Sequence, residues 1–163
     1  MKKTLLLASA LALVAIAPAQ DVKSAVGKPL PKLALKDLAG KTHTNASLKG
    51  KVVLLDFWAT WCGPCKAAAP TMNSLFGKYK GKGLQVIGVN ITDKEPAVKK
   101  YVADHKYTYP FTPASDTFAQ ALGVGPIPTF VLVDKAGKVR HVIVGFNTKS
   151  SPAEIEALVK KLL

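Results

Sequence analysis

Apolar runs along the chain predict the strands of a central sheet. Residues 52–57 and 84–90 are nearly continuous apolar segments, typical of strands buried on both faces of a parallel sheet, and Asp56 interrupts the first run. Residues 129–134 and 139–144 are further apolar runs, joined by a loop short enough for an antiparallel hairpin. A mixed sheet with a parallel centre is therefore expected.

Helical segments are expected between these strands. One is predicted over 62–80, one over 96–105 with Asp93 or Glu95 near its cap, and a short one over 118–122. Strand and helix then alternate at the start of the domain, which requires a right-handed crossover between the first two strands.

The C-terminal segment carries the clearest helical pattern. Ser151 and Glu154 have capping-box spacing with a proline between them, which predicts Ser151 as the N-cap. Apolar residues then recur at positions 155, 158, 159 and 162, the spacing of one buried helix face. The whole pattern predicts an α/β fold with a mixed central sheet and helices on both faces.

The first fifty residues have a different character. Residues 1–19 combine two lysines, a short apolar run and a small-residue ending, the pattern of a secretory signal peptide cleaved before Gln20. An uncleaved membrane anchor is the alternative. Residues 20–50 are polar and turn-rich, with a hairpin-like turn at 37–41, and are expected to form an N-terminal β extension of the domain at 51–163. The expected location is periplasmic or secreted, with membrane contact only if the leader is retained.

Composition restricts the class of partner. The 163 residues carry 23 Lys+Arg against 10 Asp+Glu, a net charge of +13, and Arg140 is the single arginine. Surfaces that bind nucleic acid usually cluster arginine, so scattered lysines predict no nucleic-acid partner. Apolar residues make up 48% of the chain, which is enough for a core, and a monomer is expected.

The only two cysteines, Cys62 and Cys65, lie directly after the first buried strand, where a helix begins. Unpaired N–H groups and the helix dipole at that point favour a thiolate. Cys62 is therefore the candidate nucleophile toward a client disulfide, and Cys65, one helical turn later, the candidate resolving thiol. Pro64 suits the first helical turn, and Gly63 leaves room for a client peptide.

Other uses of the cysteine pair are less favourable. A structural disulfide closing so short a loop restrains the unfolded chain little. A zinc site needs two more ligands, and His43, His105 and His141 lack ligand spacing, so no metal site is expected. A Cu(I) chaperone remains an alternative, because thiolates bind Cu(I). A peroxiredoxin would need a threonine three residues before its cysteine, whereas Thr60 stands two before Cys62.

Asp56 is an acid inside an apolar strand. Burial disfavours its charged form, so its pKa should rise above the ordinary value. A carboxyl with such a pKa suits a proton acceptor for Cys65. The alternative is an aspartate at a strand edge that faces solvent.

The segment VLLDFWATWCGPCK, residues 53–66, resembles the thioredoxin active site, and the order of elements over 51–163 resembles the thioredoxin fold. The start of the domain, over 27–51, resembles secreted proteins of the TlpA/ResA type, with a Redoxin-type N-terminal extension. This resemblance implies a thiol–disulfide oxidoreductase with no cofactor beyond its cysteine pair. Several members of that group reduce apocytochrome cysteines for haem attachment.

The resemblance also assigns supporting residues. Ile127-Pro128 matches the family's cis-proline loop, which implies that Pro128 packs against the cysteines and that the backbone of Ile127 pairs with a client strand. Trp61, Gly145 and Phe146 would complete an apolar rim around the thiolate.

Two departures limit the comparison. Thioredoxins place a lysine near the buried acid, but residues 87–89 contain none, and cytochrome-maturation relatives carry a glutamate where this chain has Ala68.

The direction of the reaction follows from the same comparison. Gly-Pro between the cysteines resembles reducing thioredoxins, which predicts a protein-disulfide reductase acting on client proteins with disulfides or thiols. A reductant in an oxidising compartment needs an electron donor, expected to be a membrane thiol relay. The alternative in the same class is a disulfide oxidant or isomerase.

Overall fold

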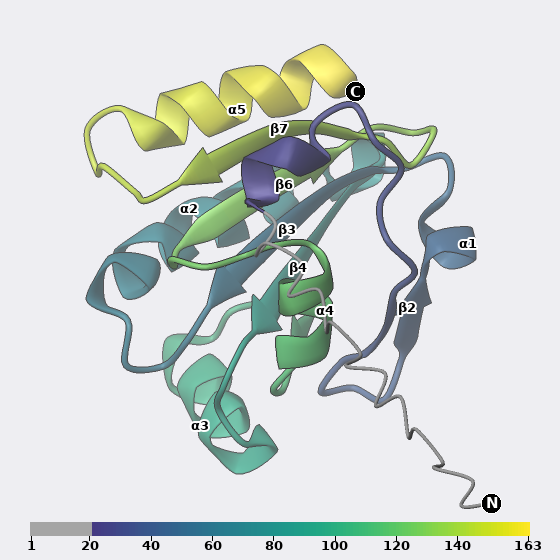
Figure 1. Cartoon of the computed structure of the whole chain (residues 1–163). Helices are drawn as coiled ribbons and strands as arrows, with labels where there is room; N and C mark the ends of the chain where they lie inside the picture. The colour runs from purple at the N-terminus through teal and green to yellow at the C-terminus, as the bar shows by residue number, and fades with distance from the viewer. Residues whose placement is uncertain (1–20) are drawn as a thin grey trace, which may run out of the picture.

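A five-stranded sheet with the strand order β5-β4-β3-β6-β7 forms the centre of the computed structural model, which describes residues 21–163 (Figure 1). The predicted signal peptide, residues 1–19, lies outside the described residues. β3 is parallel to β4 and antiparallel to β6, which confirms the mixed sheet. The strands of this sheet are β3 (Val52–Trp58), β4 (Leu84–Asn90), β5 (Phe111–Thr112), β6 (Thr129–Val133) and β7 (Val139–Val144).

The two central strands, β3 and β4, are buried along their whole length. Successive side chains of a strand point to opposite faces of the sheet. Leu54 and Trp58 therefore lie in one core, which also contains both cysteines, whereas Leu55 and Phe57 lie in a second core on the other face. Each such side chain stabilises the fold by about 1.5–3 kcal/mol through burial.

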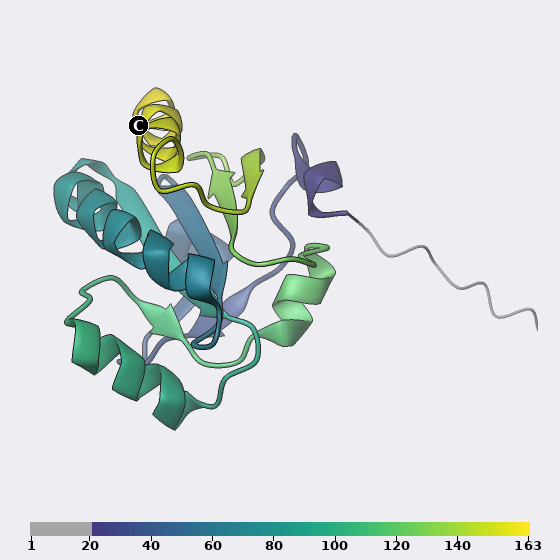
Figure 2. The ribbon, with the colours of Figure 1, turned by 90° about the vertical axis from the view of Figure 1, so that its left-hand side faces the viewer.

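Helices cover both faces of the sheet, as predicted (Figure 2). The helices α2 (Gly63–Tyr79), α3 (Glu95–His105) and α5 (Ser151–Leu162) contribute side chains to the first core. On the opposite face lie α4 (Asp116–Ala121) and the N-terminal extension, which contribute to the second core. Within residues 21–163, no helix combines the length and the apolar character needed to cross a membrane.

One predicted helix cap is wrong. The N-cap of α5 is Ser150, without a side-chain cap bond, and not Ser151. The Ser151 hydroxyl instead accepts the N–H of Asn147 at 2.9 Å, so it is already engaged by the preceding turn. The N-cap of α3 is Lys94, so Asp93 and Glu95 both lie next to the cap, in agreement with the prediction.

The strand β5 was not predicted from the sequence. Its two residues, Phe111 and Thr112, pair with Gly88 and Val89 at the edge of the sheet. Two residues are too few to produce a periodic pattern, so only the tertiary pairing defines this strand.

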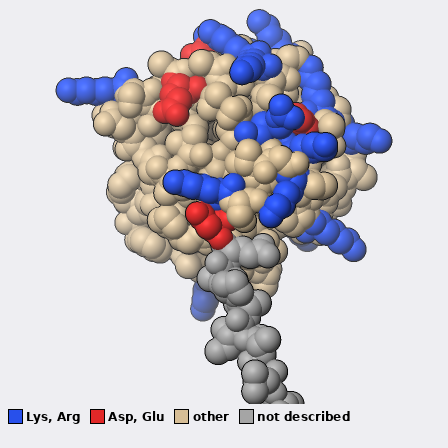
Figure 3. All heavy atoms as spheres, turned by 45° about the horizontal axis from the view of Figure 1, so that its top comes forward, with Lys and Arg blue, Asp and Glu red and all other residues tan. Residues whose placement is uncertain are grey.

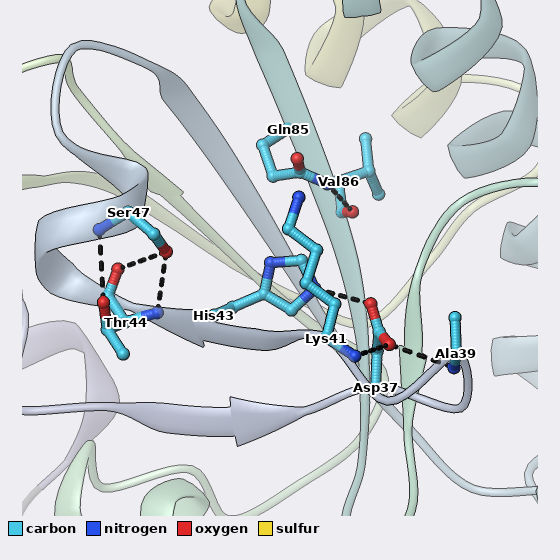
Figure 4. A network of polar contacts seen from close by, with 8 residues as sticks. All are labelled: Asp37, Ala39, Lys41, His43, Thr44, Ser47, Gln85 and Val86. Carbon is cyan, nitrogen blue, oxygen red and sulfur yellow. Dashed lines mark hydrogen bonds and ion pairs between the residues drawn. The ribbon is translucent and has the colours of Figure 1, made fainter.

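The N-terminal extension is built around the predicted turn at 37–41. It contains the 3₁₀ turn η1 (Val22–Ala25), the strands β1 (Ala34–Lys36) and β2 (Thr42–Thr44), and the helix α1 (Asn45–Leu48). Asp37 accepts the N–H groups of Ala39 and Lys41 and contacts His43 Nε2 at 2.8 Å (Figure 4). His43 lies in β2 and is 1% exposed.

Candidate active site

The cysteine pair lies at the N-terminus of α2, as predicted. Cys62 is the N-cap residue of this helix, and its Sγ accepts the N–H of Cys65 at 3.2 Å. The two cysteines are joined by a disulfide, and Pro64 occupies the first turn, where its missing N–H costs no hydrogen bond. After reduction, a thiolate on Cys62 would keep this N–H donor and the positive end of the helix dipole.

The disulfide is almost completely buried. Cys62 and Cys65 are only 5% and 2% exposed, whereas Trp61 is 65% exposed. A Cβ placed on Gly63 would meet no atom within 4 Å, so packing does not require a glycine there. The exposed surface next to the disulfide is therefore formed in part by Trp61 and Gly63.

Polar residues at the end of β4 and directly after it hold the loop that carries Trp61. The Asp93 carboxylate accepts the N–H of Thr60 at 2.6 Å and the side-chain amide of Asn90 at 2.8 Å. The indole N–H of Trp61 donates to the Thr92 hydroxyl at 3.2 Å. These contacts form a clamp on the loop before Cys62, and they were not predicted from the sequence. The clamp was detectable in principle, because the carboxyl ends of adjacent parallel strands meet at one edge of a sheet.

Asp56 is buried, which contradicts the alternative of a solvent-facing aspartate. The residue is 2% exposed, and burial raises the pKa of its carboxyl to about 7. It follows Leu54 and precedes Trp58 at alternate positions of β3, so its side chain projects to the face of the first core, where Cys65 lies. The pKa is matched to proton transfer near neutral pH, as a proton acceptor requires.

The loop before β6 contains the predicted cis-proline. The Ile127–Pro128 bond is cis, and Pro128 is buried. Ile127 and Phe146 pack against the core that contains both cysteines, and the Gly145 N–H donates to the Pro128 carbonyl at 2.8 Å. Among residues 21–163, the main-chain groups of Ile127 form no hydrogen bond, so they are available to an added strand.

The predicted site residues therefore fall into two groups. The disulfide, the buried acid and the cis-proline loop are placed by the N-terminus of α2, by β3 and by the loop before β6, and they border one core. Trp61 lies beside them as an exposed side chain rather than as part of a closed rim. The roles of these residues in client binding and proton transfer stay predictions. In the described part of the chain, no three His, Cys, Asp or Glu residues gather as a metal site would require.

Comparison with known proteins agrees with this geometry. The profile of the family described as Redoxin matches residues 25–159. The thiol-disulfide oxidoreductase ResA of Bacillus thuringiensis (strain Al Hakam) is 40% identical over 147 residues, which covers 88% of this chain and 82% of that protein. ResA of Geobacillus thermodenitrificans is 40% identical over 126 residues, covering 77% and 72% of the two chains.

A solved structure supports the fold. The crystal structure of a thiol:disulfide interchange protein of the thioredoxin family from Chlorobium tepidum superposes with a TM-score of 0.73 at 31% identity. The superposition covers 82% of this chain and 94% of the other.

Proposed function

The chain belongs to the Redoxin family and is a thioredoxin-like thiol–disulfide oxidoreductase, and from this premise we propose that it reduces protein disulfides outside the cytoplasm. The observation that carries the proposal is the position of Cys62, whose Sγ accepts a main-chain N–H at the start of α2. The redox-active group is the Cys62–Cys65 disulfide itself, and the reaction requires no further cofactor.

The reaction consists of two exchange steps. The Cys62 thiolate attacks one sulfur of the client disulfide, which forms a mixed disulfide and releases the first client thiolate. Cys65 then loses its proton and attacks the Sγ of Cys62, which re-forms the intramolecular disulfide and releases the second client thiolate. Two electrons pass from the protein to the client. The proton released earlier, when the Cys62 thiolate forms, and the proton of Cys65 together balance the two thiolates that leave.

Asp56 is proposed to accept the proton of Cys65 in the second step. Its side chain projects to the same side of the sheet as Cys65, and its pKa of about 7 lets it both bind and release a proton near neutral pH. At pH values below 7 the carboxyl is mostly protonated and cannot act as a base, so the second step should slow as the pH falls.

The proposed reducing direction rests on Gly63 and Pro64, which stand between the cysteines as in reducing thioredoxins. A reductant in an oxidising compartment must be re-reduced, and we propose a membrane thiol relay as its electron donor. Client proteins with disulfides or thiols would pair with the free backbone of Ile127 and contact Trp61 and Gly145. Apocytochrome c, with its paired cysteines, is one client class that we include, although Ala68 replaces the glutamate of cytochrome-maturation relatives.

The proposed location outside the cytoplasm rests on the secretory pattern of residues 1–19. Lys and Arg side chains project from several separate places over the face in Figure 3, with acidic side chains between them. Because acidic side chains lie among the basic ones, this face differs from the continuous basic patch of a surface that binds nucleic acid.

The redox potential tests the proposed direction. The protein is equilibrated with defined ratios of reduced and oxidised glutathione or dithiothreitol, and its thiols are counted by mass after alkylation. A potential near about −270 mV, the value of thioredoxin, supports a reductant. A potential near about −120 mV would identify an oxidant instead. Stoichiometric copper retained against a chelator, without disulfide reductase activity, would support the Cu(I) chaperone.

A further inference from the structure

The neighbour of Asp56 on β4 is a glycine. The strand register pairs Asp56 with Gly88 on one side and with Phe130 on the other. A Cβ placed on Gly88 would lie 2.6 Å from Cδ1 of Phe111 and 3.2 Å from Cε2 of Tyr109. Since real Cβ atoms essentially never come within 3.0 Å of another atom, any larger residue at this position would displace the ring of Phe111. The ring of Tyr109 would have to move by a few tenths of an ångström.

The space above Gly88 is filled by the segment that leads into β5. The Gly88 N–H donates to the Pro110 carbonyl at 2.8 Å, and the rings of Tyr109 and Phe111 lie 4.1 Å apart. Tyr109 is 3% exposed, and its hydroxyl donates to Oδ2 of Asp56 at 3.3 Å. The other carboxyl oxygen, Oδ1, has no hydrogen-bond partner in the described part of the chain. Tyr109 is therefore the side chain through which the protein contacts the polar end of Asp56.

We propose that Tyr109 is a positioning residue for the proton acceptor, and that Gly88 is required because it makes room for the packed rings of Phe111 and Tyr109 beside Asp56. The hydroxyl donates to the ionised carboxylate, stabilises it against burial, and fixes the orientation of Oδ2. This inference rests on the proposed role of Asp56 in the second exchange step.

Among the described groups around Asp56, Tyr109 is the one that donates a hydrogen bond to its carboxyl. Tyr101 on α3 has a pKa raised mainly by burial and also by the charge of Asp56. Tyr107 adjoins Tyr101 and Tyr109, and Cys65 on α2 lies in the same core. On the strands beside β3, Gly88 and Phe130 carry no charge. Burial raises the pKa of Tyr109 well above its usual value, so its hydroxyl keeps its proton and stays a donor at every pH used below.

The variant Tyr109→Phe removes the donor and keeps the ring. Without that hydrogen bond the carboxylate of Asp56 is less stable, so its pKa rises and the acid limb of the second step moves to higher pH. At pH 6 the rate of the second step should fall about three- to tenfold, and near pH 9 it should be almost unchanged. The variant Gly88→Ala, which displaces the packed rings, should change the pH profile in the same direction.

The two exchange steps are separated by stopped-flow mixing of the reduced protein with dithiobis(nitrobenzoate), whose released thiol is coloured. The first release reports the attack by Cys62, and the second reports the attack by Cys65. Tyr79→Phe is the matched control, because Tyr79 is 4% exposed and its hydroxyl bonds to Glu156 instead. We expect this control to leave both pH profiles unchanged.

The variant Asp56→Asn separates failure of this inference from failure of the proposed function. If Asp56→Asn removes the pH dependence of the second step but Tyr109→Phe leaves it unchanged, Tyr109 does not position the acceptor, and the proposed function stands. If Asp56→Asn leaves the pH dependence of the second step unchanged, Asp56 is not the acceptor and the inference about Tyr109 is wrong as well. Titration of the Asp56 carboxyl by carbon NMR gives an independent readout, with a higher midpoint expected in Tyr109→Phe.

Discussion

Asp56 is the proposed proton acceptor, and its burial also lowers the stability of the folded protein when the carboxyl is charged. Its carboxyl titrates near pH 7 in the folded protein because burial disfavours its charge, whereas in the unfolded chain it titrates near 3.8. Between these pH values the folded protein binds more protons than the unfolded chain, so the contribution of Asp56 to stability is greatest below pH 4 and is lost as the pH rises through 7.

Replacing this acid by an amide should therefore stabilise the protein at alkaline pH. We expect Asp56→Asn to raise the free energy of unfolding at pH 8 by on the order of 2–4 kcal/mol, and to change it little at pH 4. Urea unfolding at the two pH values measures the difference. A gain of equal size at both would contradict a titration-linked effect.

The clamp on the loop before Cys62 makes a second prediction for a single side chain. Asp93→Ala leaves the N–H of Thr60 without its acceptor, which should cost about 1–3 kcal/mol of stability and slow the first exchange step. Asp104→Ala is the control, because Asp104 pairs with Lys100 on the exposed surface of α3 and should change stability by less than about 0.5 kcal/mol. Equal losses in both variants would show that the clamp adds nothing.

Sequence patterns predicted elements better than their ends. The strands β3 and β4 are long apolar runs, and these runs identify them in the sequence. The cap of α5 could not be identified in the same way, because Ser151 has a capping-box partner in sequence but its hydroxyl is engaged by Asn147 in space. The short strand β5 is defined only by its pairing with Gly88 and Val89.

The corrected cap leads to a prediction for α5. Ser151→Ala removes the acceptor of the Asn147 N–H and should cost about 1 kcal/mol. Glu154→Gln should cost less than about 0.5 kcal/mol, because only an exposed first-turn charge is lost. Thermal unfolding of both variants measures the two costs. A larger loss of stability for Glu154→Gln than for Ser151→Ala would support the capping box predicted from the sequence.

At the scale of the whole molecule, the N-terminal extension and the sheet share the second core. Leu33, Leu35 and Leu48 of the extension are buried in the same cluster as Leu55 and Phe57 of β3. The Redoxin profile also begins within the extension, at residue 25. The extension should therefore unfold together with the sheet as one cooperative unit.

This cooperativity can be measured with a single core substitution. Leu35→Ala should lower the free energy of unfolding by about 2–4 kcal/mol and keep a single transition by fluorescence and circular dichroism. Lys36→Ala, at the next and exposed position of β1, should be nearly neutral. A separate early transition in Leu35→Ala would show that the extension folds independently.

The candidate site was predictable where its chemistry is local in sequence. Cys62 and Cys65 can be identified by their spacing, and Asp56 by its position inside an apolar strand. Tyr109 could not be found in this way, because 53 residues separate it from Asp56 and only the pairing of β5 with β4 brings it there. Gly88 carries no chemical signal either, since its role is the absence of a side chain.

The central claim is that Cys62 attacks the client and Cys65 resolves the mixed disulfide, and covalent trapping tests it most directly. Cys65→Ser and Cys62→Ser variants are expressed in the native host, their thiols are quenched with acid, and mixed disulfides are quantified by mass spectrometry. The account predicts client adducts on Cys62 of the Cys65→Ser variant and almost none on the Cys62→Ser variant. Adducts of equal abundance on both variants, or on neither, would contradict it.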